Sequence, residues 1–539
     1  MRPRDTGRLE AGEYDLLVIG GGVYGLTIAY DAASRGLRTA LVEASDFGSG
    51  ASFNHQKTVH GGLRSLQTGR LDRAREAIME RRALARIAPW FLRAQPFLVG
   101  TYRSAVKSRI ALRAAFRIDA WLGRRRNEGV EPELQIPAPK LISKAATLRL
   151  FSGIKPEKLT GGAQWYDYQM VESDRLTVAF AAAADLARAD IANYVEAIAA
   201  IKENGRVVGM TARDRESGGE LAIRARLTIN AAGARAGEVM ALFGVNRPHP
   251  LLKAMNLVTS KPASDIALAA PTAAGRMLTI VPWRGRAIIG TGHSEALIDP
   301  ASATVTAAEL ESFIAQANQA FPALRLTRAD VRMVHQGAMP AETDRAGKPD
   351  LRQAPEIRDH AQDGAAGALT VIGVKYTTAR GVAERAVTAA GKRLGRRLPR
   401  SRTATRPLPG AAIADHEALA IETARAAAMD LPTPVTRHLS ALYAEGSAGI
   451  VRLIAERPEL GAPVSPGCDT LGAEVVHVIR HEMAVKLSDI VVRRTALGSG
   501  GHPGADAVRG CGVIAAQELG WTADRLEEEI GAVDAIYAF

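Results

Sequence analysis

The chain has 539 residues, enough for two or three domains, and its 47% hydrophobic and 23% charged content is that of a folded globular protein. Two cysteines exclude a disulfide framework, and no apolar run reaches the roughly twenty residues of a membrane-spanning helix. The net charge of +12 favours an anionic partner, which could be a phosphorylated substrate, a membrane surface or a nucleic acid.

The first predicted unit is a strand, a glycine loop and a helix. Residues 15–19 form a buried apolar run, which is followed by Gly20-Gly21-Gly22-Val23-Tyr24-Gly25, a helical stretch, and a second strand at 39–43. Glycines at this spacing let the backbone approach a pyrophosphate at a helix N-terminus. Glu43 ends the second strand, where a carboxylate accepts ribose hydroxyls. We therefore predict a dinucleotide site rather than a chance glycine turn.

The next segment favours FAD over NAD as the dinucleotide. Phe47-Gly48-Ser49-Gly50-Ala51-Ser52 is rich in glycine and serine, whereas the corresponding segment of NAD enzymes usually contains less glycine. This preference for FAD over NAD rests on an analogy with other proteins of the same fold, and no single residue decides it.

Further elements follow along the chain. Strands are predicted at 227–230, 277–281, 287–289 and 369–373, and a helix at 307–320. Residues 392–406 contain seven basic residues and no acidic ones, which indicates a linker. From residue 416 onward, helix-length apolar patterns predict a mainly helical C-terminal domain.

A block of cations lies beside a glycine pair in Lys57-Thr58-Val59-His60-Gly61-Gly62-Leu63-Arg64. With the glycine loop, this block resembles the signature of the FAD-dependent, quinone-linked glycerol-3-phosphate dehydrogenases, which ends in K-x-x-H-G-G-L-R. Further matches follow in the family's order: Asp174-Arg175-Leu176, Asn230-Ala231-Ala232-Gly233, Val281-Pro282-Trp283, Ile288-Ile289-Gly290-Thr291, Gly373-Val374-Lys375-Tyr376-Thr377-Thr378, and the stretch from Arg480-His481-Glu482 to Arg493-Arg494-Thr495.

The resemblance implies an enzyme that oxidises the secondary alcohol of glycerol 3-phosphate to dihydroxyacetone phosphate, by hydride transfer to FAD, and passes the electrons to a quinone. It implies catalytic roles for Arg64, Lys375 and His60. The implied substrate contacts are Arg64, Lys253, Asn256, His335, Met339 and Lys375. The implied FAD contacts are Gly20, Gly21, Gly22, Val23, Tyr24, Gly25, Glu43, Ala44, Gly50, Ala51, Ser52, Lys57, Thr58, Ala197, Ala232, Gly233, Gly373, Val374, Lys375, Tyr376 and Thr377.

Two of the basic residues with implied site roles, Arg64 and Lys375, could instead have structural roles. Arg64 could instead form a surface salt bridge. Lys375 is less easily explained as a surface residue, because only 13 of the 69 basic residues are lysines. One cation is expected to hold a phosphate and the other to stabilise reduced flavin.

Departures from the family's pattern cluster at the predicted substrate pocket. Met339, in Gly337-Ala338-Met339-Pro340, stands where the family has a phosphate-binding Arg. Asn256 replaces a His, Ser65 replaces a Tyr, and Thr291-Gly292-His293 replaces T-T-D. Loss of a bidentate phosphate ligand lowers affinity for a phosphate. The same flavin chemistry on a different phosphorylated polyol, alcohol or amine is therefore an alternative.

Another alternative is an unchanged substrate whose phosphate is held by Lys253 or Arg332 instead. The proton acceptor could be His60, His293 or His335, because histidine titrates near neutral pH, although a lone histidine is more often a structural, hydrogen-bonding residue. No cluster of His, Asp or Glu has metal-ligand spacing, so we predict no metal.

The basic segment 103–126 mixes arginines with Phe116 and Trp121, which suits a helix lying on anionic lipid. A helix packed by its apolar face on the substrate domain is the equal alternative. The resemblance favours the membrane, since the quinone lies there, and we expect a cytoplasmic protein on the inner membrane face. The 392–406 segment is either solvated or a second lipid contact. Nothing resembles a nucleic-acid-binding module.

The predicted fold is α/β. A discontinuous FAD-binding Rossmann-like domain (1–85, 165–240, 365–390) alternates with an antiparallel-sheet substrate domain (86–164, 241–364). A basic linker (391–410) and an all-helical C-terminal domain (411–539) follow. A monomer and a homodimer both stay open. The alternative from another class is a nucleotide-binding protein without redox turnover.

Overall fold

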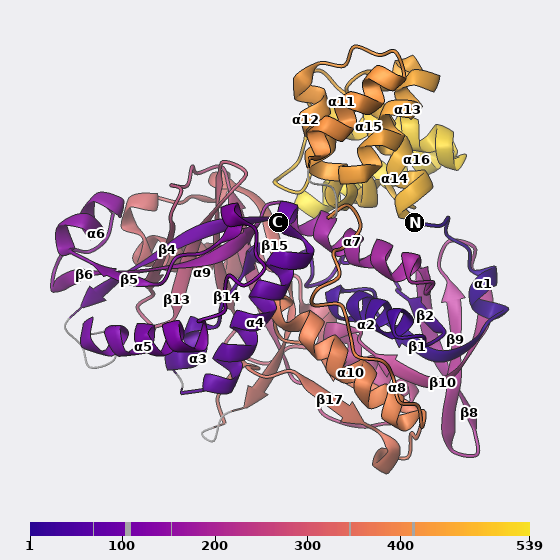
Figure 1. Ribbon diagram of the computed structural model, residues 1–539, viewed down its shortest axis with the longest axis horizontal. Coiled ribbons are helices and arrows are strands. Elements are labelled where there is room, and N and C mark those ends of the chain that lie inside the picture. Colours follow the sequence, from indigo (N-terminus) through magenta and orange to yellow (C-terminus); the bar gives the residue numbers. More distant parts are fainter. Residues whose placement is uncertain (68, 103–108, 152, 344–346, 412–414) are drawn as a thin grey trace.

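The computed structural model describes residues 1–67, 69–102, 109–151, 153–343, 347–411 and 415–539. Two sheets and a cluster of helices make up the molecule, and the C-terminal helices stand together to one side of the sheets (Figure 1). The α/β fold with a helical C-terminal domain is thus confirmed.

The first sheet carries the glycine loop. Its order is β17-β18-β10-β1-β2-β7, and β9 pairs with both β10 and β8. Strands β18, β10, β1, β2 and β7 run parallel, whereas β17 and β9 are antiparallel to their neighbours. The bounds are β1 Glu13–Ile19, β2 Thr39–Val42, β7 Asp190–Ala192, β8 Val195–Glu203, β9 Arg206–Asp214, β10 Glu220–Asn230, β17 Glu356–Asp359 and β18 Ala368–Ile372.

Three helices lie side by side on one face of this sheet: α2 (Val23–Ser34), α7 (Ser173–Leu186) and α10 (Ala379–Arg393) (Figure 1). Their apolar residues share one core with the sheet, because each helix has an apolar face that must be buried. Helix α8 (Ala236–Leu242) packs on β10 and β18, and α1 (Gly7–Glu10) contacts β10 and β7.

The second sheet has the order β16-β15-β11-β14-β13-β12-β4-β6-β3, with β5 beside β6. Its pairs are antiparallel except β12 with β4. The bounds are β3 Thr58–Val59, β4 Leu92–Tyr102, β5 Lys140–Ile142, β6 Leu159–Met170, β11 Leu251–Thr259, β12 Ala267–Pro271, β13 Met277–Trp283, β14 Arg286–His293, β15 Val331–Thr343 and β16 Pro349–Leu351. The helices between its strands are α3 Leu63–Gln67, α4 Leu71–Ile87, α5 Arg109–Leu122, α6 Lys144–Leu150 and α9 Ala307–Ala320.

Sheet membership differs from the predicted domain boundaries at three places. The short strand β3 pairs with β6, so residues 58–59 belong to the second sheet, and β6 lies in that sheet over its whole length to Met170. By contrast, β17 pairs with β18 in the first sheet. The predicted boundaries placed these segments in the other domain because the linear sequence does not show which distant strands pair.

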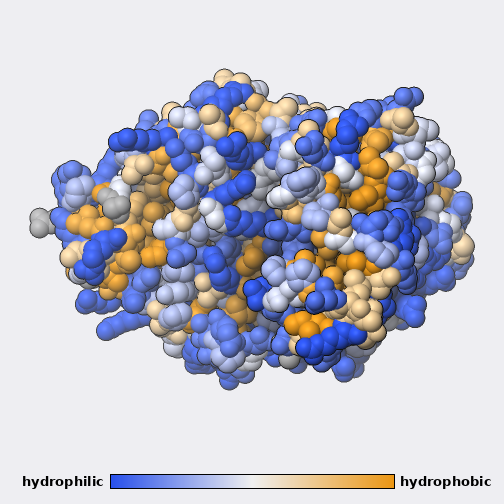
Figure 2. All heavy atoms as spheres, turned by 90° about the horizontal axis from the view of Figure 1, so that it is seen from above, coloured by the Kyte–Doolittle hydropathy of each residue, from blue (hydrophilic) through white to orange (hydrophobic). Residues whose placement is uncertain are grey.

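The C-terminal helices have a core of their own, which also touches the end of the second sheet through Trp283 and Met333. The helices are α11 His416–Ala426, α12 Thr433–Tyr443, α13 Ser447–Glu456, α14 Gly472–Glu482, α15 Ala505–Leu519 and α16 Ala523–Tyr537, with a π-helical turn at Asp489–Arg494. Seen from above, the surface is mostly hydrophilic, with separate apolar patches among the charged side chains (Figure 2).

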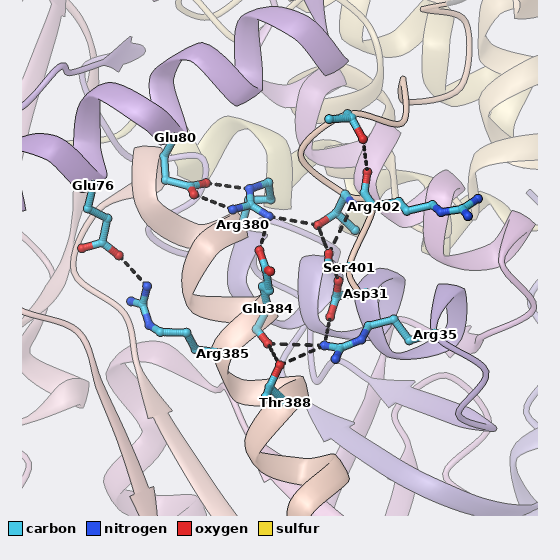
Figure 3. A network of polar contacts seen from close by, with 12 residues as sticks. Asp31, Arg35, Glu76, Glu80, Arg380, Glu384, Arg385, Thr388, Ser401 and Arg402 are labelled. Atoms are coloured by element: carbon cyan, nitrogen blue, oxygen red, sulfur yellow. Dashed lines mark hydrogen bonds and ion pairs between the residues drawn. The ribbon is translucent and has the colours of Figure 1, made fainter. Parts of the chain in front are cut away.

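The segment after α10 is docked on the first domain and is not simply solvated. Ser401 donates a hydrogen bond to Asp31 of α2 at 2.5 Å, and Arg380 of α10 bonds to Thr403 and Glu80 (Figure 3). The backbone N–H of Leu408 also donates to Ile87. Thr403 is buried, so at this residue the prediction that 392–406 is solvated is wrong, and Leu408, in the predicted linker 391–410, is buried as well.

Buried ion pairs join the C-terminal helices to the FAD-binding domain. Asp46, three residues after Glu43, accepts hydrogen bonds from Arg494 at 2.7 and 2.8 Å and from Arg493 at 2.6 Å. Asp46 and Arg494 have fully buried side chains. Burial alone would raise the pKa of Asp46, but the charges of Arg494 and Arg493 outweigh it and hold that pKa below its ordinary value. Asp46 therefore stays ionised in this buried cluster because of the neighbouring arginine charges.

We expect Asp46→Asn to destabilise the protein by about 3–5 kcal/mol, because it leaves the fully buried Arg494 without a carboxylate, while Arg493 keeps its pair with Asp489. Guanidinium unfolding followed by circular dichroism measures the change. The control is Glu527→Gln, which removes a carboxylate from an exposed pair with Arg509 and should leave the free energy of unfolding nearly unchanged. Equal stability of the two variants would show that the buried pairs contribute little.

Candidate functional site

The glycine loop connects β1 to α2 and leaves no room for side chains. Gly20 has a φ of +108°, and a Cβ there would lie 2.6 Å from the carbonyl oxygen of Ala231. A Cβ on Gly25 would overlap the carbonyl oxygen of Gly20. Gly22 caps α2 in an extended conformation, so the first N–H groups of the helix lie at the loop. This geometry fits a pyrophosphate held by backbone N–H groups at a helix N-terminus.

Glu43 and Ser52 hold the loop from the side. The carboxylate of Glu43 accepts hydrogen bonds from the N–H of Gly21 at 2.5 Å and of Ser45 at 2.8 Å, and burial raises its pKa. The hydroxyl of Ser52 accepts the N–H of Val23 at 2.9 Å. These contacts bring the segment 43–52 against the start of α2. One oxygen of Glu43 thus bonds to the glycine loop at Gly21 and the other to Ser45.

The segment after β18 meets the glycine loop through Tyr24. Its hydroxyl donates to the carbonyl of Lys375 at 2.8 Å and accepts the N–H groups of Val374 at 3.1 Å and Lys375 at 3.2 Å. A Cβ on Gly373 would collide with the ring of Tyr24. The structure thus brings residues 373–377 to the start of α2, although almost 350 residues separate them in sequence.

Some of the remaining predicted FAD residues lie next to this loop, whereas Thr58 lies in the second sheet. Ala231, Ala232 and Gly233 follow β10, whose parallel pairing with β1 places its end beside Gly20. The N–H of Val195, at the start of β8, donates to Glu43, and Ala197 lies two residues further on this strand. Ala44 lies between Glu43 and Ser45, Gly50 and Ala51 precede Ser52, and Thr58 is buried in β3.

His60 and Asp167 form a hydrogen-bonded pair beside residues 373–377. The backbone N–H of His60 donates to the hydroxyl of Thr377 at 3.0 Å, and its Nδ1 lies 3.2 Å from Asp167 Oδ2. Asp167 also accepts hydrogen bonds from Gly61 at 2.7 Å and from Arg81. Burial would raise the pKa of Asp167, but the His60 hydrogen bond and the Arg81 charge lower it below its ordinary value.

This arrangement orients the imidazole of His60. An ionised carboxylate only accepts hydrogen bonds, so in a neutral His60 ring Nδ1 carries the proton and Nε2 is the acceptor. The side chain of His60 is half exposed, so Nε2 is accessible. Asp167 lies on β6, 107 residues away in sequence. Sequence reasoning selected His60 and missed its partner.

Lys57 is fully buried at the junction of the two sheets. Its ammonium donates to the carbonyl of Phe53 at 2.7 Å, lies 3.5 Å from Asp174 and sits 4.2 Å from the centre of the Phe53 ring. Burial lowers its pKa, with Asp174 opposing the shift. The contacts of this side chain are therefore with Phe53 and Asp174 and not with the glycine loop.

The second sheet presents a row of residues to the segment 53–57. Thr279, Gly290, Asn256 and His335 are directly opposite one another on β13, β14, β11 and β15, so they share one face. Thr279 bonds to Gln56, which lies in that segment, at 2.9 Å. Asn256 accepts the hydroxyl of Thr291 at 2.8 Å.

His55 links this row to residues 373–377, and sequence reasoning missed this histidine. Its carbonyl lies 3.2 Å from His335 Nδ1, and its ring centre lies 5.2 Å from that of Tyr376. The available signal was a titratable residue two positions before Lys57, between the predicted FAD contacts Ser52 and Lys57.

Lys253 lies on the opposite face of the second sheet. Its ammonium bonds to Glu309 at 2.8 Å and to the carbonyl of Thr304 at 2.7 Å, at the start of α9. Side chains alternate along a strand, so Lys253 and Asn256 point to opposite faces. The prediction that Lys253 binds the substrate is therefore not retained.

The other residues predicted at the substrate pocket lie in different parts of the structure. Met339 is half-buried and lies four residues after His335, so it faces the same side of β15. His293 bonds to the carbonyl of Ser294, and Arg332 is exposed beside Gly501 of the C-terminal domain. Arg64 is the second residue of α3, and its side chain is outside the described part of the structure.

Comparisons with known proteins match this chain over most of its length. The family model of FAD dependent oxidoreductases matches residues 15–387, and that of the C-terminal domain of alpha-glycerophosphate oxidase matches residues 401–526. The chain is 32% identical to a glycerol-3-phosphate dehydrogenase of Mycobacterium leprae (97% of this chain, 88% of the relative) and 30% identical to one of Synechocystis (96% and 95%). A solved glycerol-3-phosphate dehydrogenase from Bacillus halodurans, complexed with FAD, is 25% identical with a TM-score of 0.76, covering 98% of this chain and 96% of that one.

Proposed function

Because the chain belongs to the family of FAD-dependent glycerol-3-phosphate dehydrogenases, we propose that it oxidises the secondary alcohol of glycerol 3-phosphate to dihydroxyacetone phosphate and passes the electrons to a quinone. The chain is an FAD-dependent oxidoreductase, and its glycine loop, Glu43 and residues 373–377 fit the cofactor. The observation that carries the proposal is the His60–Asp167 pair, which stands beside residues 373–377.

The chain's own residues supply a base for the reaction. Bound FAD accepts the hydride. Nε2 of His60 accepts the hydroxyl proton of the substrate, and Asp167 stabilises the imidazolium that forms, because its carboxylate already bonds to Nδ1. Arg81 and Gly61 keep this carboxylate in place. These groups come together only in the folded chain: His60 follows β3, Asp167 lies on β6, Arg81 lies on α4, and Thr377 follows β18.

Arg64 and Lys375 are the proposed cations for substrate and reduced flavin. The main chain of Lys375 is fixed by Tyr24, and its side chain is half-buried. Another phosphorylated polyol, alcohol or amine is the second candidate for the substrate. The observation that favours it is Met339, an apolar residue on the face of β15 that carries His335.

A substrate panel distinguishes these candidates. The purified yellow protein is mixed without oxygen with glycerol 3-phosphate, glycerol, longer phosphorylated polyols and amines, and flavin absorbance is followed. Bleaching by glycerol 3-phosphate supports the first candidate. Bleaching by another compound, with none by glycerol 3-phosphate, would replace it by the second.

We also propose that α5 rests on an anionic membrane, where the quinone is available. Leu112 and Phe116 pack on Ala163 of β6, whereas Ile110, Ile118 and Trp121 are exposed, Trp121 by 65%. The helix therefore has an inner face that packs and an outer apolar face flanked by exposed arginines. Within the described part of the chain, no helix combines the length and apolarity that spanning a bilayer needs.

Replacing Ile118 and Trp121 by Glu should weaken binding to phosphatidylserine vesicles at least about 10-fold, because it removes interfacial apolar groups and adds repulsion from anionic lipid. Vesicle co-sedimentation at low salt measures the change. The matched control is Leu186→Glu, which changes an exposed leucine on α7. Equal binding by all three proteins would place the membrane contact elsewhere.

A further inference from the structure

Two buried imidazole nitrogens at the junction of the sheets have no hydrogen-bond partner. They are Nε2 of His55 and Nε2 of His335, both shielded from solvent. His335 is completely buried, in register with Asn256 on the row that faces the segment 53–57. Buried polar atoms are ordinarily satisfied, so unpartnered nitrogens on two residues that are joined by the contact of His335 Nδ1 with the His55 carbonyl indicate a ligand group here.

The backbone fixes which nitrogen of each ring carries the proton. Nδ1 of His55 accepts the N–H of Lys57 at 2.9 Å, so the proton of a neutral ring is on Nε2. Nδ1 of His335 donates to the carbonyl of His55 at 3.2 Å, so Nε2 of a neutral ring is an acceptor. The pair therefore offers one donor and one acceptor.

Both rings are neutral near pH 7. Burial lowers the pKa of His55 well below its usual value, and the charges of Lys57, His335 and His60 lower it further, while the carbonyl of Ser52 opposes the shift. Burial and then Lys57 lower the pKa of His335 in the same way, against the carbonyl of His55. Two neutral rings do not neutralise an anion.

We propose that His55 and His335 form a hydroxyl-binding subsite that holds a non-reacting hydroxyl group of the substrate. This inference rests on the proposed function. A hydroxyl accepts a hydrogen bond from Nε2–H of His55 while it donates one to Nε2 of His335. A phosphate dianion offers no proton to His335, and a methyl group satisfies neither nitrogen.

The position of the pair supports this assignment. The ring of His55 lies against Tyr376, which is in the segment fixed by Tyr24 at the glycine loop. His335 lies on the substrate-side sheet. A molecule held between them would lie between the two sheets, on the side where His60 bonds to Thr377.

Asparagine variants test the subsite, because each keeps the backbone contact and deletes Nε2. In His335→Asn the amide can still donate to the His55 carbonyl, and in His55→Asn the amide oxygen can still accept the Lys57 N–H. The substrates are glycerol 3-phosphate and propane-1,2-diol 1-phosphate, which lacks only the non-reacting hydroxyl. The control variant is His502→Asn, which changes a histidine paired with Asp534 far from the site.

We expect the wild-type protein and His502→Asn to prefer glycerol 3-phosphate at least about 100-fold in kcat/KM, because a site built to bind a hydroxyl rejects the analogue without it. His335→Asn and His55→Asn should lose most of this preference and retain the bound flavin, measured as its absorbance per protein.

Other outcomes overturn the proposal in distinguishable ways. If the wild type oxidises both compounds equally, or if both variants keep the full preference, the subsite is wrong and the proposed function stands. A variant that loses flavin or changes its spectrum while keeping the preference would show that the nitrogens contact FAD. If the wild type oxidises neither compound, the proposed function fails and the subsite fails with it.

Discussion

The His60→Asn variant is expected to bind FAD normally and to lose about 10²–10⁴-fold in the rate of flavin reduction by substrate. Asparagine can still donate to Asp167, so the fold around β6 should persist, but an amide has no nitrogen that takes up a proton. Anaerobic stopped-flow absorbance of the flavin measures the rate, and the flavin content of the purified protein checks that the cofactor is present.

Asp167→Asn provides a second test of the same pair. It removes the carboxylate that fixes the protonated nitrogen of His60 and pairs with buried Arg81, so we expect a large loss of rate with a loss of stability. Flavin reduction within a few-fold of wild type in His60→Asn would mean that another group takes up the proton, whatever Asp167→Asn does.

We expect Gly25→Ala to yield a protein without bound FAD. The added Cβ would overlap the carbonyl oxygen of Gly20, which is backbone and cannot rotate away. The loop and the start of α2 would therefore move apart, and the N–H groups that face the pyrophosphate would be displaced. Absorbance near 450 nm relative to 280 nm measures the flavin bound after purification.

The matched control for this variant is Gly531→Ala. Gly531 lies in α16, has an ordinary φ and has nothing within 4 Å of an added Cβ, so alanine should be tolerated there. A full complement of flavin in Gly25→Ala would contradict the assigned role of the loop. Loss of flavin in both variants would point to general instability.

The glycine loop was predictable because its determinants are local. Strand, loop and helix follow one another within residues 13–34, and the steric need for Gly20 and Gly25 arises from backbone contacts at this turn. The α/β class and the helical C-terminal domain follow from apolar periodicity in the same way. These parts of the fold need no knowledge of distant contacts.

The rest of the site depends on pairings that a single sequence does not reveal. Asp167 reaches His60 only because β6 pairs with β3, and Lys253 faces α9 because of its place in the alternation of β11. The same limit applies to 392–406, where Arg396 pairs with Asp15 across 381 residues. Composition showed the charge of this segment and not where it docks.

The structure shows that the basic residues behind the net charge of +12 differ in their surroundings. Lys57, Lys253 and Arg494 are buried and paired, so they contribute to the fold. The exposed arginines of α5 are free to meet lipid in the proposed account.

We propose that this enzyme takes hydride from the secondary carbon of glycerol 3-phosphate. The most direct test of this proposal is anaerobic flavin reduction by glycerol 3-phosphate, compared with the same compound carrying deuterium at carbon 2. We expect the flavin to bleach and deuterium to slow the bleaching. A flavin that stays oxidised with saturating glycerol 3-phosphate, but is bleached by another alcohol or amine, would contradict it.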